Sequence, residues 1–187
     1  MSLLAPFTTV LDLADGVLTP QRKLVERTLG DMDGMYAVRV PESRLDEVVY
    51  RVSEIPVPLD EGNLLSSTTT IEPGTVEGEY HMTKGHFHAK IDRAEIYVTL
   101  AGEGRLVMAT EEGEPAVEPM GRGTVNYVPG GWAHRSVNVG SGPLVFLAAF
   151  PADAGYDYKT IEDQGFPVLI VERDSGPEVI PNPRYRG

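Results

Sequence analysis

The chain has 187 residues, of which 41% are hydrophobic, so it is long and apolar enough to fold as one domain around its own core. Its formal net charge of −12 at pH 7 argues against partners with an anionic surface, both nucleic acids and membranes. Because it contains no cysteine, a metal site would have to use nitrogen and oxygen ligands.

The first part of the chain, residues 1–47, reads as an extension ahead of the main domain. Its start has no basic segment, and no stretch of the chain reaches the roughly 18 apolar residues of a membrane helix, so we expect a cytoplasmic protein. Weak alternation in the first residues suits a strand at a sheet edge. The pair Thr19-Pro20 predicts the start of a short helix that ends at Gly30, and a single helical turn is predicted over 43–47.

From Val48 onward the hydrophobic period changes to two, and glycine and proline punctuate the chain at regular intervals. Strand-sized apolar runs lie between these turn signals, at 105–109, 124–128, 144–150 and 166–172. Many short strands at regular spacing predict an all-β barrel or a double-sheet jelly roll. We expect a single domain over 1–187, with the β-barrel at 48–172 and a C-terminal tail at 173–187.

The segment 83–102 carries three potential metal ligands, His86, His88 and Glu95. The two histidines are two residues apart, so on an extended chain both rings leave from the same face. Glu95 begins an alternating run that puts Tyr97 on its own face. A carboxylate buried beside two imidazoles carries a high desolvation cost, which a divalent cation removes.

A second unit follows at 123–138, where Pro129 and neighbouring glycines predict a tight turn and His134 begins a new strand. The two units can converge on one ion through three imidazoles and one carboxylate. An isolated His-x-His pair is more often structural, but here three of the four histidines belong to the two units. His81 lies outside them, and we expect it to form a hydrogen bond rather than to bind metal.

These two units resemble the two sequence motifs of the cupin family. The first differs from most cupins in the longer gap between His88 and Glu95. The longer first segment, together with residues 150–158, resembles the cupin-type glucose-6-phosphate isomerases of archaea, and the resemblance covers most of 48–166. The second unit fits the pattern G-x5-P-x-G-x2-H-x3-N at every fixed position: Gly123, Pro129, Gly131, His134 and Asn138.

The resemblance implies a cupin double-stranded β-helix, with short N-terminal helices and additional strands, that assembles as a homodimer. It also implies a metal-dependent aldose–ketose isomerase that interconverts glucose 6-phosphate and fructose 6-phosphate. The expected cofactor is a divalent transition metal, with Fe²⁺ ahead of Mn²⁺, Ni²⁺, Co²⁺ and Zn²⁺. The ion would chelate O1 and O2 of the open-chain sugar. Glu95 would be the base in an enediol route or a ligand in a hydride shift, and Tyr97 would orient the reacting groups.

The same resemblance implies a set of residues that bind the sugar phosphate. Some family members have histidine at the position of Tyr156 and tyrosine at that of Phe150, so this chain departs from them at two places. The alternatives are a cupin dioxygenase that uses Fe²⁺ and O₂, and a cupin that binds metal and sugar phosphate without catalysis; mannose 6-phosphate is a further possible substrate. The substrate-binding residues implied are Tyr50, Thr70, Thr83, Gly85, Tyr156 and Tyr158.

Overall fold

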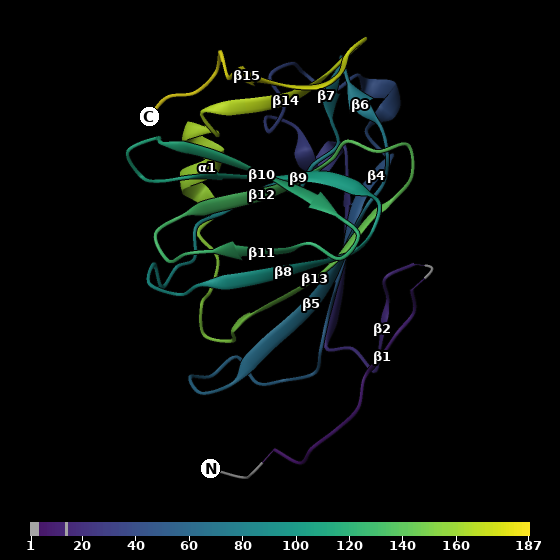
Figure 1. The fold of residues 1–187 in the computed structure, drawn as a ribbon, viewed down its shortest axis with the longest axis vertical. Helices are drawn as coiled ribbons and strands as arrows, with labels where there is room; N and C mark the ends of the chain where they lie inside the picture. Colours follow the sequence, from purple (N-terminus) through teal and green to yellow (C-terminus); the bar gives the residue numbers. More distant parts are fainter. Residues whose placement is uncertain (1–3, 14) are drawn as a thin grey trace.

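Antiparallel strands dominate the computed structural model, which describes residues 4–13 and 15–187 (Figure 1). The largest sheet has six strands in the order β11-β8-β13-β5-β4-β3. Its members are β3 (Lys23–Thr28), β4 (Val48–Glu54), β5 (Leu64–Ile71), β8 (Glu95–Ala101), β11 (Val125–Val128) and β13 (Leu144–Pro151).

Three smaller sheets complete the fold. A three-stranded sheet contains β9 (Glu103–Ala109), β10 (Pro115–Gly121) and β12 (Ala133–Asn138), and in Figure 1 it lies above β11, β8, β13 and β5. A four-stranded sheet contains β6 (Thr75–Val76), β7 (Glu79–Tyr80), β14 (Val168–Arg173) and β15 (Gly176–Pro181). The remaining elements are the hairpin of β1 (Val10–Leu11) and β2 (Leu18–Thr19), and the short helices η1 (Gly30–Met32), η2 (Glu42–Arg44) and α1 (Lys159–Gln164).

This arrangement confirms the predicted all-β cupin fold, and β8 shows how the fold creates room for a site. Its side chains alternate as predicted, but the buried face is the polar one: Glu95 and Tyr97 are 4% and 6% exposed, whereas Ile96 is 37% exposed. Burying polar groups is unfavourable unless they find partners. The inner face of this sheet is therefore built for a ligand rather than for apolar packing alone.

Asn138, the last residue of the second motif, joins three parts of the fold. Its side-chain amide donates to the carbonyl of Ile71 at 2.8 Å and to that of Gly142 at 3.0 Å. Its Oδ1 accepts the backbone N–H of Gly140 at 2.9 Å. The side chain is fully buried, and these three bonds satisfy its polar atoms at the end of β12.

The helix predicted after Thr19-Pro20 is wrong, because the segment Lys23–Thr28 forms β3 and pairs along its length with β4. Only the short η1 follows it. Pairing with β4 satisfies backbone N–H and C=O groups of this segment, and it outweighs the local preference for a helix start at Thr19-Pro20. The single helical turn predicted over 43–47 is present as η2, which begins one residue earlier and ends at Arg44.

The C-terminal stretch predicted as a tail contains β15, which pairs antiparallel with β14 from Val168↔Pro181 to Arg173↔Gly176. At the other end of the chain, the loop of the β1–β2 hairpin contacts the outer face of β5, where the Thr70 hydroxyl donates to the Asp15 carbonyl at 2.9 Å. Among the described residues, no helix combines the length and apolar character needed to cross a membrane.

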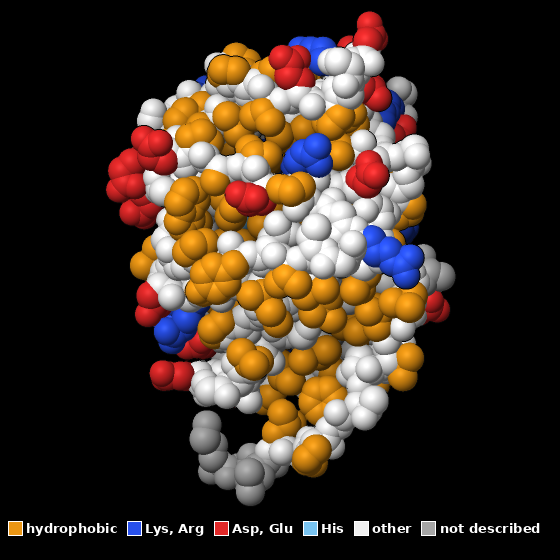
Figure 2. All heavy atoms as spheres, in the orientation of Figure 1, with side chains coloured by type: hydrophobic (Ala, Val, Ile, Leu, Met, Phe, Trp, Pro, Cys, Tyr) orange, Lys and Arg blue, Asp and Glu red, His pale blue; other side chains and the backbone are white. Residues whose placement is uncertain are grey.

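Hydrophobic side chains also gather outside the core. Figure 2 shows a band of them across the molecule in the view that displays the six-stranded sheet. On strands β5, β8 and β11 the exposed apolar residues are Leu64, Ile96, Val125 and Tyr127. Because they leave the face opposite Glu95, this outer surface is separate from the polar interior.

Candidate metal centre

Four side chains from two sequence units converge between the sheets: His86, His88 and Glu95 from the first, and His134 from the second. One ligand atom from each lies within 4.8 Å of the others. Nε2 of His88 and Nε2 of His134 lie 3.2 and 3.0 Å from Glu95 Oε2. The structure thus brings together all four residues that the sequence selected as metal ligands.

Backbone pairing sets the relative positions of these ligands. The N–H of His86 donates to the carbonyl of His134 at 3.2 Å, and the N–H of His134 donates to the carbonyl of His86 at 3.0 Å. The two rings therefore leave from opposed backbone positions, with their centroids 4.6 Å apart. Glu95 opens β8 opposite Val128 of β11, close to the turn that precedes His134.

The hydrogen bonds around the imidazoles leave their other nitrogens facing the centre. Nδ1 of His88 lies 2.8 Å from the carbonyl of Arg93, and Nδ1 of His134 lies 3.2 Å from the carbonyl of Trp132. A carbonyl only accepts, so we infer that both Nδ1 atoms carry the proton. The Nε2 atoms of all three histidines are buried and make no hydrogen bond within the described chain. Three buried Nε2 atoms that make no hydrogen bond, two of them within 3.2 Å of Glu95 Oε2, fit a divalent transition metal.

The charges of the cluster favour a cation as well. Burial raises the pKa of Glu95, but the contacts with His134 and His88 outweigh this effect and lower the pKa to about 2. The carboxylate is therefore ionised at neutral pH. Burial and the neighbouring His134 hold the pKa of His86 well below its ordinary value. Burial also lowers the pKa of His88, yet the contacts with Glu95 and the Arg93 carbonyl outweigh it and leave the pKa raised.

A cavity opens from the cluster toward the surface, and it receives most of the predicted substrate residues. His88 lies behind this cavity, whereas His86, Glu95 and His134 face it. The predicted residues that line the cavity are Tyr50, Thr83, Gly85, Tyr97, Tyr156 and Tyr158.

The structure does not bring Thr70 to this cavity. Its side chain leaves the opposite face of β5, where the hydroxyl is bonded to Asp15, and the neighbouring Thr69 lines the cavity instead. Successive side chains of a strand point to opposite faces, so a shift of one residue exchanges the two threonines. Alternation along β5 separates them, but only the tertiary structure shows which face is inside.

Sequence reasoning also missed residues on β3. Arg27 and Lys23 line the cavity, and they belong to the segment that was predicted as a helix. Glu54 lines it too and is paired with Arg22. No sequence motif identifies these charged residues, and their position near the site follows from the pairing of β3 with β4.

The two positions at which we expect a departure from some family members, Phe150 and Tyr156, both adjoin histidines of the cluster. The Phe150 ring stacks on His88, with centroids 5.7 Å apart. The Tyr156 ring meets His86 edge-on at 4.8 Å and stacks against Tyr158 at 5.7 Å. Aromatic rings therefore pack against two of the three histidines of the cluster.

Comparisons with a family model and with individual proteins point to the same family. The family model described as glucose-6-phosphate isomerase matches residues 26–180, a range that includes all four ligands. The glucose-6-phosphate isomerase of Thermococcus kodakarensis is 46% identical over 184 residues, and that of Pyrococcus horikoshii is 45% identical over 185 residues; each match covers 97% of both chains.

More distant similarity extends to bacteria. A glucose-6-phosphate isomerase of Sinorhizobium medicae is 37% identical over 180 residues, with 93% of this chain and 84% of the relative covered. Among solved structures, an oxalate decarboxylase of Bacillus subtilis matches 58% of this chain and 27% of its own, with 25% identity and a TM-score of 0.45.

Replacing His88 by Ala should weaken Co²⁺ binding by at least about tenfold, because one of three imidazole ligands is lost. Equilibrium competition with a chromophoric chelator measures the affinity. The matched control is His81→Ala, because Nδ1 of His81 lies 3.2 Å from the Glu72 carbonyl, outside the cluster. Equal affinities in the two variants would contradict the ligand assignment.

The Co²⁺ affinity of the wild type should also fall as the pH is lowered through the raised pKa of His88, since protons then compete for its nitrogen.

Proposed function

The chain belongs to the glucose-6-phosphate isomerase family, and we propose that its cavity interconverts glucose 6-phosphate and fructose 6-phosphate with a divalent metal held by His86, His88, Glu95 and His134. The observation that carries this proposal is the convergence of four ligand atoms at the base of a cavity that also carries hydroxyl groups and cations. A bound metal would act as a Lewis acid that stabilises the charge developing on the sugar oxygens. We propose Fe²⁺, which accepts nitrogen and oxygen ligands.

The phosphate group fits the other end of this cavity, although the chain as a whole is acidic. Arg27 and Lys84 supply positive charge there. Burial raises the pKa of Tyr158 to about 12 despite the opposing effect of Arg27, so its phenol stays protonated and can donate a hydrogen bond. Gly85 has φ +76°, and a Cβ at this position would come within 2.6 Å of Phe166, so glycine lets the backbone lie at the cavity wall.

Hydroxyl groups complete the proposed phosphate site. Thr69, Thr83 and Tyr50 line the same cavity, and each offers a hydroxyl. The pKa of Tyr50 is raised by burial, while contacts with Lys84 and Arg27 oppose the rise. Tyr50 is therefore a neutral donor that contacts the backbone of Lys84 and lies near the Arg27 guanidinium, which suits a dianion.

Isomerisation moves one hydrogen between C2 and C1 of the sugar while protons are redistributed on O1 and O2. In the enediol route, the Glu95 carboxylate takes the C2 proton and returns it to C1. In the hydride route, the hydrogen moves from C2 to C1 with its electron pair, and Glu95 stays ionised as a ligand. The pKa of about 2 favours the second role, because an efficient general base has a pKa nearer the working pH.

Tyr97 adjoins Glu95 on the inner face of β8 in either route. Burial and the neighbouring carboxylate raise the pKa of Tyr97 well above its ordinary value, so the phenol remains protonated. We propose that it orients Glu95 or the sugar oxygens by donating a hydrogen bond.

We further propose that the enzyme is a cytoplasmic homodimer, formed by one domain over residues 1–187. The exposed apolar residues on the outer face of β5, β8 and β11 support this assembly, because a large apolar patch on a soluble protein commonly marks an interface. Their location opposite the polar interior leaves the cavity free.

A coupled assay of fructose 6-phosphate conversion tests the proposed function directly. We expect turnover by the purified protein, its loss after EDTA treatment, and its return when one of Fe²⁺, Mn²⁺, Co²⁺, Ni²⁺ or Zn²⁺ is added back. Turnover that is insensitive to EDTA would overturn the metal requirement. Sugar phosphate binding without turnover would support the non-catalytic alternative, and oxygen consumption would support a dioxygenase.

Replacing Glu95 by Gln should lower kcat by about 10²- to 10⁴-fold, because the amide keeps the shape of the side chain but can neither accept the proton nor supply charge to the ion. Running the wild-type reaction in D₂O separates the two routes. Deuterium at C1 or C2 of the product supports the enediol, and its absence supports hydride transfer. A Glu95→Gln variant that kept most of its turnover would contradict both roles.

Thr69→Val should raise KM for fructose 6-phosphate by about tenfold, because a hydrogen bond to a charged group is lost in a side chain of the same shape. Thr70→Val is the matched control, and it should leave KM unchanged while lowering the free energy of unfolding by about 1 kcal/mol through the lost bond to Asp15. Initial rates and urea denaturation measure the two effects. If Thr70→Val raised KM and Thr69→Val left it unchanged, the phosphate contact would be assigned to Thr70 instead.

A further inference from the structure

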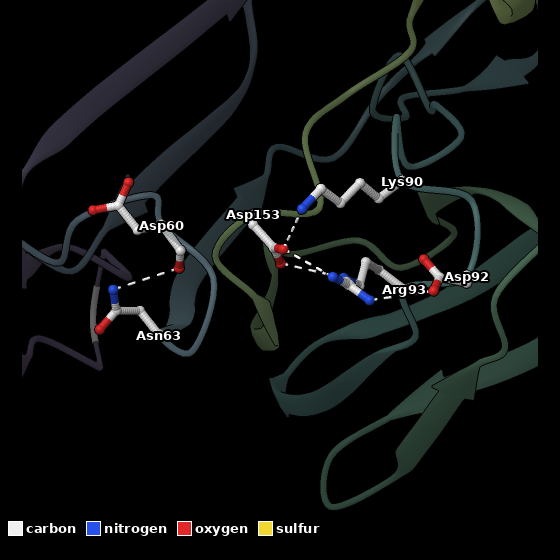
Figure 3. Close-up of polar contacts among 6 residues, drawn as sticks. All are labelled: Asp60, Asn63, Lys90, Asp92, Arg93 and Asp153. Carbon is white, nitrogen blue, oxygen red and sulfur yellow. Dashed lines mark hydrogen bonds and ion pairs between the residues drawn. The ribbon is translucent and has the colours of Figure 1, made fainter.

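The loop of residues 89–94, which joins His88 to Glu95, is held by a carboxylate from a distant part of the chain. Asp153 accepts hydrogen bonds from both Nε of Arg93, at 3.2 Å, and Nη2 of Arg93, at 2.9 Å. It also pairs with Lys90 Nζ at 2.6 Å. Figure 3 shows Arg93 and Lys90 reaching Asp153 from the same side, while Asp92 contacts Arg93 from the other.

The same loop supplies the group that orients one of the proposed ligands. The backbone carbonyl of Arg93 lies 2.8 Å from Nδ1 of His88. Such a bond fixes both the tautomer and the ring orientation of a metal-binding histidine. The position of this carbonyl depends on where the loop is held, and the Arg93 side chain ties that residue to Asp153.

We propose that Asp153 is a positioning residue for the metal centre, acting through Arg93 on the orientation of His88. This inference rests on the metal site of the proposed function. Asp153 touches neither the ligands nor the cavity, since its bonds are made to the side chains of Lys90 and Arg93. Its effect therefore reaches the ligand through the backbone of the loop.

Backbone contacts make the loop a rigid link rather than a flexible tether. The N–H of Lys90 donates to the carbonyl of Ala154 at 2.8 Å, beside Asp153 itself. On the other side, the N–H of Gly131 donates to the carbonyl of Ile91 at 2.6 Å, in the turn before His134. A Cβ on Gly130 would lie 2.8 Å from the Asp92 carbonyl, so the loop packs closely against that turn.

The segment that carries Asp153 continues into the aromatic wall of the cavity. Phe87 and Asp157 exchange backbone hydrogen bonds of 3.2 and 2.8 Å, which places Tyr156 beside His86. The ion pairs of Asp153 thus join the loop that orients His88 to the segment that places Tyr156 beside His86.

Exposed ion pairs usually contribute little to stability, and Asp153 differs from them in geometry. Arg93 binds it through two nitrogens, an arrangement that fixes direction as well as distance. The Asp153 side chain is 8% exposed, whereas that of Asp92, which also contacts Arg93, is 73% exposed. Asp92 is accordingly a control of the same charge in the same loop.

The test uses Co²⁺ as the probe and compares Asp153→Ala with Asp92→Ala in the full chain. Chelator competition gives the Co²⁺ affinity, and transfer to excess EDTA gives the release rate. We expect Asp153→Ala to bind Co²⁺ about tenfold more weakly and to release it faster, as found when groups that orient a ligand are removed. Asp92→Ala should stay within about twofold of the wild type, because an exposed ion pair adds little.

Arg93→Ala provides an independent check, since it removes the side chain that reaches Asp153 and keeps the backbone carbonyl. Its Co²⁺ affinity should match that of Asp153→Ala. The double variant should bind Co²⁺ no more weakly than the weaker single variant, because both changes remove the same Arg93–Asp153 contact. Asp153→Asn, which keeps an acceptor oxygen, should recover part of the affinity.

Urea denaturation of the metal-free proteins separates positioning from general stability. If Asp153→Ala lost stability but kept the Co²⁺ affinity and release rate of Asp92→Ala, the residue would be structural only and this inference would be overturned. Additive effects of Asp153→Ala and Arg93→Ala on affinity would also overturn it. Failure of the wild-type protein to bind Co²⁺ would overturn the metal centre itself, and with it both proposals.

Discussion

A buried carboxylate surrounded by three imidazoles is the constraint on which the rest of this structure depends. Glu95 is ionised at neutral pH, and the Nε2 atoms around it lack hydrogen-bond partners among the described residues. In an interior of low dielectric constant such a group is unfavourable unless a cation completes it. The fold brings these atoms within 4.8 Å of one another, so its architecture buries a negative charge among groups suited to hold a metal ion.

Two sets of groups surround this carboxylate: those that contact the imidazoles directly, and those that enclose the cavity around them. Backbone carbonyls of Arg93 and Trp132 hold the imidazoles by their outer nitrogens, and reciprocal hydrogen bonds between His86 and His134 fix the distance between two of the ligands. Beyond them, aromatic rings and the inner faces of β5 and β8 enclose a cavity whose lining also includes Lys23, Arg27 and Lys84. Positive side chains are thereby concentrated at one cavity of a chain that is acidic as a whole, and local charge decides binding at short range.

The connection of residues 89–94 between His88 and Glu95 has a structural role in this arrangement. Its residues form a loop that is bonded on one side to the segment after β13 and on the other to the turn before His134. A shorter connection would lack the Arg93 side chain that reaches Asp153. The loop thus connects both histidine-bearing units, and it does so without placing a side chain in the cavity.

The sequence by itself determined the four residues of the candidate metal centre, the polar face of β8 and the all-β class. These depend on local spacing: histidines two apart, alternation with a period of two, and turns at glycine and proline. Tertiary structure alone decided that Lys23–Thr28 is a strand, that Thr69 rather than Thr70 faces the cavity, and that Asp153 holds the loop before Glu95. Each of these depends on which segments pair across the sheets and on which face closes inward. Such choices are made between residues far apart in the chain, where local periodicity carries no information.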